Sequence, residues 1–186
     1  VFIFPIQWIP ANPRWQNYVD IWNKIPLAKF VLNTTKLTLI VTFLQLLTSS
    51  FAAYAFAKLY FKGKDLLFLA YIATIAVPWQ VYMVPQFMMM RSMGLADTHL
   101  AIICLQAFSA FGVFMMKQFY EGIPTELCEA ARIDGMTEYQ IWYRIMLPLS
   151  KPSLSTLTIF TFVGTWNDFL GPLIYLRTET KKTIQL

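Results

Sequence analysis

Four long apolar stretches, separated by short charged segments, dominate the hydrophobic pattern along the chain. They occupy about residues 30–57, 66–90, 98–118 and 150–176, and few charged residues lie within them. A helix that crosses a bilayer needs about 20 mostly apolar residues at ~1.5 Å each. The pattern therefore predicts an all-α membrane protein, a polytopic helical bundle with four spans. Buried helices of a large soluble protein are the weaker alternative, because four stretches reach spanning length.

Composition agrees with a membrane location. Of the 186 residues, 57% are hydrophobic and 13% are charged, whereas a soluble domain carries roughly 25% charged residues. The net charge is +5, but the basic residues are spread along the chain, so nucleic-acid binding is not predicted. Cys104 and Cys128 are too few for a disulfide framework and are predicted to be reduced and buried.

The lysines and arginines of the short loops predict an orientation. The connector 58–65 holds three lysines, whereas the connector 91–98 holds one arginine. Cytoplasmic loops carry the excess of positive charge in membrane proteins, so 58–65 and, by alternation, the charged insert at 119–149 are predicted to be cytoplasmic. Residues 1–29 are then an external lead-in loop, with a short amphipathic helix predicted at 15–25 from apolar residues at helical spacing.

The charged insert has the sequence signals of a helical hairpin. Pro124 suits a first helical position, and the helix is predicted to run through Asp134. Gly135 supplies the left-handed residue that commonly follows a helix. Thr137 and Gln140, three residues apart, form a capping box that begins a second helix.

The second helix of the insert is predicted to carry Ile141, Trp142 and Ile145 on one face and to end at Pro148. Two adjacent alanines make one side of the first helix slim, which allows another backbone to approach closely. On the residues alone two interpretations stay open. The insert is either a docking element for another protein or an amphipathic hairpin that lies on the membrane surface without a partner.

The insert also carries a longer signature. The pattern E-A-A-x3-G-x9-I-x-L-P is matched by Glu129, Ala130, Ala131, Gly135, Ile145, Leu147 and Pro148. It resembles the signature of the permease subunits of binding-protein-dependent ABC importers. Further stretches resemble the carbohydrate branch of these subunits, the maltose-permease G-type family: NTTKLTLIVTF (33–43), AAYAFAKLYFKGKD (52–65), VPWQVYMVPQF (77–87), QFYEGIPTELCEAARIDG (118–135) and FTFVGTWNDFLGPLIYL (160–176).

The resemblance implies the transmembrane domain of an ATP-driven importer over residues 30–186. Members of the family usually have six spans, so the chain is expected to cover spans two to five, without the first and last spans. The location would be the bacterial or archaeal cytoplasmic (inner) membrane, in contact with membrane lipid.

The resemblance also implies partners and docking residues. The insert would contain a coupling helix that docks on a dimer of separate ATPase subunits through Glu129, Ala130, Ala131 and Gly135. A second permease subunit, different or identical, would complete the membrane part. An extracytoplasmic solute-binding protein would deliver a sugar substrate.

No residue pattern in the sequence suggests catalysis by this chain. The phosphate-binding pattern G-x-x-x-x-G-K-[ST] is missing from the sequence, so a separate chain is expected to hydrolyse ATP. The sequence shows no nucleophile–base set and has a single histidine, His99. We therefore expect no catalytic residue, no cofactor and no metal site.

Polar residues within the apolar stretches are the candidates for a substrate pathway. They are Gln45, Gln80, Gln106, Trp166, Asn167 and Asp168. An aromatic ring beside an amide and a carboxylate suits sugar binding, although Asp168 is also interpretable as an interfacial cap that never touches substrate. Pro78 and Pro85, seven residues apart, are predicted to share one face of the second span and to kink it, either along the pathway or as a packing feature.

The cargo is less constrained than the fold. An ABC importer for another solute, such as glycerol phosphate or a polyamine, is the runner-up to a sugar importer. No Lys or Arg lies at 37–57, 66–90 or 98–116, which disfavours an anionic cargo. An ATP-independent secondary transporter and a structural membrane protein are alternatives of different classes, and the coupling signature argues against both.

Overall fold

The computed structural model describes residues 14–186, and all regular secondary structure in this part of the chain is helical. The all-α prediction is therefore confirmed for these residues. Residues 1–13 of the predicted lead-in loop lie outside the described residues. The α-helices are α1 Gln16–Lys24, α2 Leu27–Lys58, α3 Lys64–Ala73, α4 Trp79–Ser92, α5 His99–Gln106, α6 Ala110–Glu121, α7 Glu126–Ile133, α8 Glu138–Ile141, α9 Leu147–Leu149, α10 Lys151–Trp166 and α11 Leu170–Tyr175.

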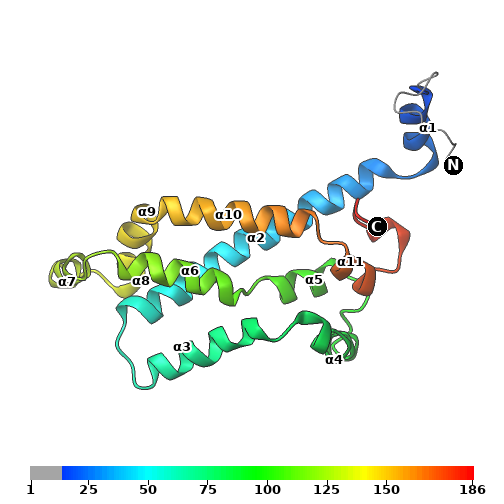
Figure 1. Cartoon of the computed structure of the whole chain (residues 1–186). Helices are drawn as coiled ribbons and strands as arrows, with labels where there is room; N and C mark the ends of the chain where they lie inside the picture. Colours follow the sequence, from blue (N-terminus) through cyan, green and yellow to red (C-terminus); the bar gives the residue numbers. More distant parts are fainter. Residues whose placement is uncertain (1–13) are drawn as a thin grey trace, which may run out of the picture.

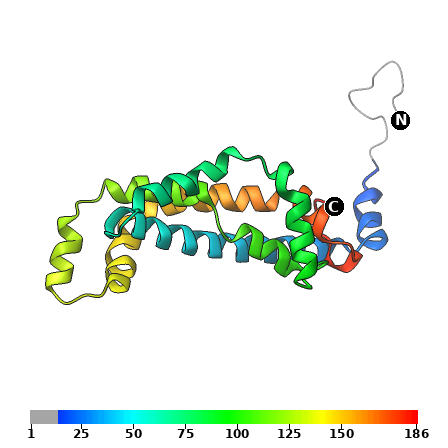
Figure 2. The same cartoon turned by 90° about the horizontal axis from the view of Figure 1, so that it is seen from below.

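The helices form an elongated bundle with a hairpin at one end (Figures 1 and 2). Helix α2 runs through the bundle and packs mainly against α6 and α10. Helices α7 and α8 lie at the same end as the turn from α2 to α3, whereas α11 and the C-terminus lie at the opposite end (Figure 1). The lysine-rich loop 58–65 and the charged insert therefore share one end of the molecule, as expected if both face the cytoplasm.

A face of small side chains along α2 forms the centre of the bundle. Its buried members include Thr34, Thr38, Thr42, Ser49 and Ala53. A Cβ atom at Gly112 of α6 would lie 2.5 Å from Oγ of Ser49, so a larger residue where α6 meets α2 would displace the Ser49 side chain. Small residues let helix backbones approach closely where no water is present to drive apolar packing.

Within residues 14–186, two helical stretches, Leu27–Lys58 and His99–Glu121, are long and apolar enough to cross a membrane. The pair Lys64–Ala76 and Trp79–Ser92 meets the same criterion only when the two are taken together. The last apolar stretch is divided by a break at 167–169 into α10, of 16 residues, and the short α11. The four apolar stretches thus correspond to α2, α3–α4, α5–α6 and α10–α11, and their passage through a membrane stays a prediction.

The second stretch is broken, which corrects the expectation of one kinked helix. The two halves are bent by 101° at the break before Trp79. Pro78 forces the preceding residue out of the helical region, and Val77 is accordingly extended (φ −89°, ψ 111°). Pro85 lies inside α4, beyond the bend, so the two prolines do not share one face of a continuous helix.

Two further proline predictions for the insert are wrong. Helix α7 begins at Glu126, after an irregular residue at Pro124, so Pro124 does not occupy the first helical position. Pro148 does not end the second helix, because helical structure continues to Leu149. A π-helical turn at Trp142–Met146 (η2) ends two residues before Pro148, and this wider turn accommodates a residue that lacks a backbone N–H.

Hydrogen bonds hold the C-terminal segment against the end of the bundle where α11 lies. Asn33 of α2 donates from Nδ2 to the carbonyl oxygens of Thr180 and Lys182, at 3.0 and 2.9 Å. Asp97, which precedes α5, has a left-handed backbone (φ 56°). Its carboxylate accepts hydrogen bonds from the backbone N–H groups of Arg177 and Thr178, from the Thr178 hydroxyl, and from Lys181 Nζ.

These contacts predict a pH-dependent contribution of Asp97 to stability. The Thr178 hydroxyl and the two backbone amides hold the pKa of the Asp97 carboxyl well below its usual range. A depressed pKa stabilises the fold above the unfolded-state pKa of ~3.9 and stops doing so as pH falls through the folded-state pKa. We expect Asp97→Asn in the full-length protein to lower the thermal midpoint in detergent at pH 7, with a difference that shrinks on acidification below about pH 4.

Asparagine also tolerates the left-handed backbone, so this variant removes the charge and one acceptor oxygen without straining the backbone. Asp134→Asn is the matched control, because Asp134 is exposed at the end of α7. An unchanged midpoint for Asp97→Asn at pH 7 contradicts the assignment.

Candidate functional site

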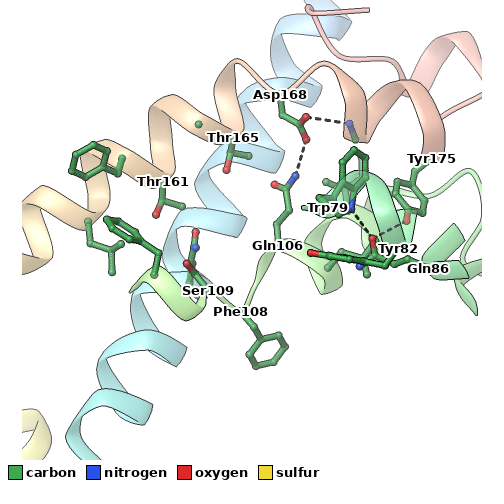
Figure 3. Close-up of a pocket in the computed structure, with 18 residues that line it drawn as sticks. Trp79, Tyr82, Gln86, Gln106, Phe108, Ser109, Thr161, Thr165, Asp168 and Tyr175 are labelled. Atoms are coloured by element: carbon green, nitrogen blue, oxygen red, sulfur yellow. Dashed lines mark hydrogen bonds between the residues drawn. The ribbon is translucent and has the colours of Figure 1, made fainter. Parts of the chain in front are cut away.

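A cavity of about 460 Å3 lies between α2, α4, α5, α10 and α11 (Figure 3). Aromatic side chains form much of its wall, and amides, hydroxyls and one carboxylate interrupt them. The aromatic members are Trp79, Tyr82, Phe108, Phe111, Phe160 and Tyr175. Among the described residues no Lys, Arg or His lines this cavity.

Gln106 and Asp168 form the first polar cluster of the cavity (Figure 3). Gln106, the last residue of α5, donates from Nε2 to Oδ2 of Asp168 at 2.7 Å. The other oxygen of Asp168 accepts from the backbone N–H of Gly171 at 3.1 Å and caps the start of α11. The Oε1 atom of Gln106 is buried and has no partner within the described chain. Because a buried carbonyl without a partner is costly, this atom is a candidate acceptor for a ligand hydroxyl.

Gln86 forms the second polar cluster, which the sequence analysis did not single out. Its Oε1 atom accepts from Trp79 Nε1 at 2.9 Å and from the Tyr175 hydroxyl at 3.3 Å (Figure 3). Trp79 and Gln86 are seven residues apart and therefore share one face of α4. The seven-residue spacing could have predicted the contact between Trp79 and Gln86 from the sequence. The contact between Gln86 and Tyr175 could not be predicted, because it depends on the tertiary fold.

The predicted pathway residues fall into two groups. Gln45, Gln106 and Asp168 line the cavity. Gln80 is exposed and lies outside the cavity lining. Trp166 stacks on Phe162, and Asn167 donates to the carbonyl oxygen of Val163 at 2.9 Å, so both belong to the end of α10 rather than to the cavity.

The hairpin is the second candidate site, and its turn has the predicted geometry. Gly135 has φ +80°, and Thr137 and Gln140 form the predicted capping box. Glu129 and Ala130 are exposed on α7. Ala131 is only 4% exposed and packs into the core beneath α7, so it faces its own chain.

Two apolar side chains of α7 are exposed as well. Leu127 and Ile133 lie at the two ends of α7, and Ile133 is 87% exposed. A single exposed isoleucine does not define an interface, but together with Glu129 it gives α7 an apolar and a charged group that a partner could contact. Arg132, three residues after Glu129, forms an ion pair with Glu138 with an Nε–Oε1 distance of 2.7 Å.

The cysteine prediction is correct for one residue only. Cys128 is buried in the core beneath the hairpin, and burial raises the pKa of its thiol. Cys104 is exposed, in contrast to the prediction. It lies in a stretch of α5 that is apolar on every side, so sequence periodicity could not tell which face packs inward. In residues 14–186 no group of three or more His, Cys, Asp or Glu residues is placed to hold a metal ion.

Comparison with known proteins identifies a consistent set of relatives. Residues 25–179 match the family described as binding-protein-dependent transport system inner membrane component. The chain is 38% identical over 178 residues to the arabinooligosaccharides transport system permease protein AraQ of Halalkalibacterium halodurans, covering 95% of this chain and 64% of that protein. It is 34% identical over 172 residues to the lactose transport system permease protein LacG of Rhizobium radiobacter, covering 92% and 63%.

A solved structure also resembles the chain. It is the crystal structure of a bacterial ABC transporter involved in the import of the acidic polysaccharide alginate. One of its chains has a TM-score of 0.87 and 28% sequence identity, with 95% of this chain and 62% of that chain covered. The chain thus spans a little less than two thirds of the length of these relatives.

The contact between Asp168 and Gly171 yields a test of the cavity geometry. A Cβ atom at Gly171 would lie 2.4 Å from Oδ2 of Asp168, the oxygen that accepts from Gln106. We expect Gly171→Ala to displace this carboxylate and to destabilise the full-length protein by about 1–3 kcal/mol. Thermal unfolding in detergent is the measurement.

Gly164→Ala is the matched control, because nothing lies within 4 Å of a Cβ atom there. The destabilisation by Gly171→Ala should also shrink in an Asp168→Ala background, where the clashing oxygens are gone. Equal midpoints for the two glycine variants would refute the geometry.

Proposed function

The chain belongs to the family of binding-protein-dependent transport system inner membrane components, and we propose that it is the sugar-translocating permease subunit of an ATP-driven importer. In this proposal the subunit crosses the inner membrane several times. It works with a dimer of ATPase subunits, a second permease subunit and an extracytoplasmic binding protein. Catalysis of ATP hydrolysis belongs to the ATPase chains.

The observation that carries this proposal is the geometry of the hairpin. The hairpin has two arms, α7 and α8. Glu129 and Ala130 are exposed on α7 at one end of the bundle, and the left-handed Gly135 turns the chain from α7 toward α8 (Figure 2). A short helix with an exposed carboxylate and an exposed Ile133 offers both a polar and an apolar contact to a partner. An amphipathic hairpin without a partner would instead leave Ile133 in water or in lipid, on the same helix as three charged residues.

The docking residues then have different roles. Glu129 is the polar contact to the ATPase, and Ala130 allows its backbone to approach. Ala131 supports the docking surface from beneath, because its small side chain lets α7 pack closely on its own core. Gly135 fixes the angle between the two arms of the hairpin.

The cavity is proposed as this subunit's part of the sugar pathway. Aromatic faces with a few convergent amides and hydroxyls suit a ligand that is neutral and rich in hydroxyl groups. The single carboxylate, Asp168, already accepts from Gln106 and Gly171, and no cation is present in the described lining. An anionic cargo such as a glycerol phosphate would find repulsion here and no charge partner. A cationic polyamine would have to displace the Gln106 contact to reach Asp168.

Exposed apolar side chains on the outside of the bundle support the proposal that this surface contacts membrane lipid and a second permease subunit. They include Leu66, Leu67 and Leu69 of α3 and Ile159 and Val163 of α10. Such surfaces are unfavourable in water and suit a hydrocarbon environment or a partner helix.

Substitutions at the hairpin test the docking proposal. In the full-length subunit we expect Glu129→Ala to weaken ATPase recruitment by roughly tenfold or more, because a charge-assisted contact is lost. Gly135→Val should act similarly, because a β-branched residue at φ +80° costs about 1 kcal/mol or more and tilts the two arms. Co-purification of the ATPase and sugar-stimulated ATP hydrolysis are the readouts.

Glu126→Ala is the control, since Glu126 is exposed on the same helix but lies outside the signature. Membrane insertion should stay near normal in all three variants. Normal co-purification and normal hydrolysis in both Glu129→Ala and Gly135→Val would exclude the hairpin as the docking site.

A pair of glutamine variants tests the pathway proposal. Gln106→Met preserves length and removes the buried amide, so we expect uptake of a neutral sugar to fall by about tenfold, as for a lost ligand hydrogen bond. Gln80→Met makes the same change at an exposed position outside the cavity and should leave uptake unchanged. ATPase recruitment should be unaffected in both. Equal uptake by the two variants would argue against a pathway through this cavity.

A further inference from the structure

Three residues on one face of α2 contact the hairpin and connect it to the bundle. Phe51, Tyr54 and Lys58 are three and four residues apart, so their side chains lie together on the last two turns of α2. They contact both arms of the hairpin, although none of them belongs to the E-A-A signature. These contacts join helix α2 to the proposed docking element at more than one point.

Lys58 holds the entry to the first arm. Its Nζ atom donates to the carbonyl oxygen of Ile123 at 2.6 Å and lies 3.4 Å from the hydroxyl of Thr125. Both residues lie in the short segment that leads into α7. The start of α7 is therefore tied to the end of α2.

Glu138, the first residue of α8, joins three helices through one carboxylate. Its Oε1 and Oε2 atoms accept from Nε and Nη2 of Arg132 at 2.7 and 3.2 Å. Its Oε2 atom also accepts from the hydroxyl of Tyr54, whose side chain is only 2% exposed. The Arg132 hydrogen bonds hold the pKa of the Glu138 carboxyl below its usual range, so it is ionised at neutral pH.

Aromatic contacts surround this junction. The ring of Phe51 stacks on Tyr139 with 5.7 Å between centroids and meets Trp142 edge-on at 5.4 Å. Apolar contacts allow sliding, whereas hydrogen bonds have a narrow range of length and angle. The three-way junction at Glu138 therefore fixes the orientation of α7 and α8 relative to α2.

Helix α2 extends from this junction to the cavity without a break. It is a single helix of 32 residues, and it places Gln45 in the cavity lining. Nine residues separate Gln45 from Tyr54, a distance of ~14 Å along the helix. The neighbouring route through α3 and α4 is bent by 101° and cannot act as a straight rod.

We propose that Tyr54, Glu138 and Arg132 form a rigid joint through which displacement of the hairpin moves α2 and thereby the cavity wall at Gln45. The proposal rests on the docking function proposed above for the hairpin. All three are positioning residues, since none lines the cavity and hydrogen bonds join them to one another. Their role is to make hairpin and helix move as one body.

The test uses the full-length subunit assembled with its ATPase and second permease in proteoliposomes. Tyr54→Phe keeps the ring and removes only the hydroxyl at the joint. We expect normal ATPase co-purification and continued ATP hydrolysis, but roughly a tenfold fall in sugar uptake per ATP hydrolysed. Tyr60→Phe, at a residue that is 95% exposed, should leave this ratio unchanged.

Two results would overturn the joint. One is an unchanged ratio in Tyr54→Phe. The other is loss of ATPase co-purification in that variant, which would mean that the hydroxyl merely keeps the hairpin folded. Failure of the docking proposal is recognised separately, because Glu129→Ala would then co-purify normally whatever happens at Tyr54.

A cross-link gives a second, independent measurement. Cysteines replace Phe51 and Tyr139, whose rings are in contact, in a chain whose native cysteines are changed to serine. A short bifunctional thiol reagent then links the two cysteines covalently and locks the hairpin to α2. If the joint is rigid throughout the cycle, locked and unlocked samples should transport equally. Loss of uptake on locking, recovered when the link is cleaved, would show that the hairpin pivots on α2 and would refute the proposal.

Discussion

The contact between Ser49 of α2 and Gly112 of α6 sets the separation of the two helices around which the bundle is built. A side chain at Gly112 would force Ser49 to move, because a Cβ atom there would lie 2.5 Å from its hydroxyl and 3.2 Å from its Cβ. Helix α2 carries Gln45 on one side of this contact and Tyr54 on the other, and α6 leads toward the hairpin. The positions of both candidate sites therefore depend on one close helix crossing, as expected where packing rather than water drives association.

The polar chemistry of the molecule is concentrated where helices stop. Gln106 ends α5, Asp168 lies in the break between α10 and α11, and Trp79 follows the bend at Pro78. Broken helices expose backbone groups that must be satisfied by side chains, ligand or water, so in a membrane they are tolerated only inside protein or beside a cavity. This constraint explains why the cavity lies next to three interruptions, whereas the uninterrupted α2 contributes one amide to its wall.

Local signals made much of the fold predictable. The first apolar stretch at 30–57 coincides with α2, and the left-handed Gly135 and the capping box at Thr137 follow directly from residue type and spacing. Partnerships across the chain were not predictable. Tyr54 and Glu138 are 84 positions apart, and neither lies in a pattern that singles it out. Predictions of helix ends from prolines alone were wrong. At Pro148, for example, a π-helical turn earlier in the helix allows the helix to continue through the proline. Only some of the cavity residues were predicted from the sequence. In apolar stretches without a clear periodicity, the sequence does not show which amide side chains point inward.

Dependence of sugar uptake on ATP is the most direct test of the central claim that the chain is a subunit of an ATP-driven importer. The full-length subunit would be reconstituted in vesicles with its ATPases, second permease and binding protein, and uptake of a neutral radiolabelled sugar would be followed with ATP or a non-hydrolysable analogue. The account predicts accumulation against a gradient only when ATP is hydrolysed. Accumulation that continues with the analogue, driven by an ion gradient alone, would contradict it and favour a secondary transporter.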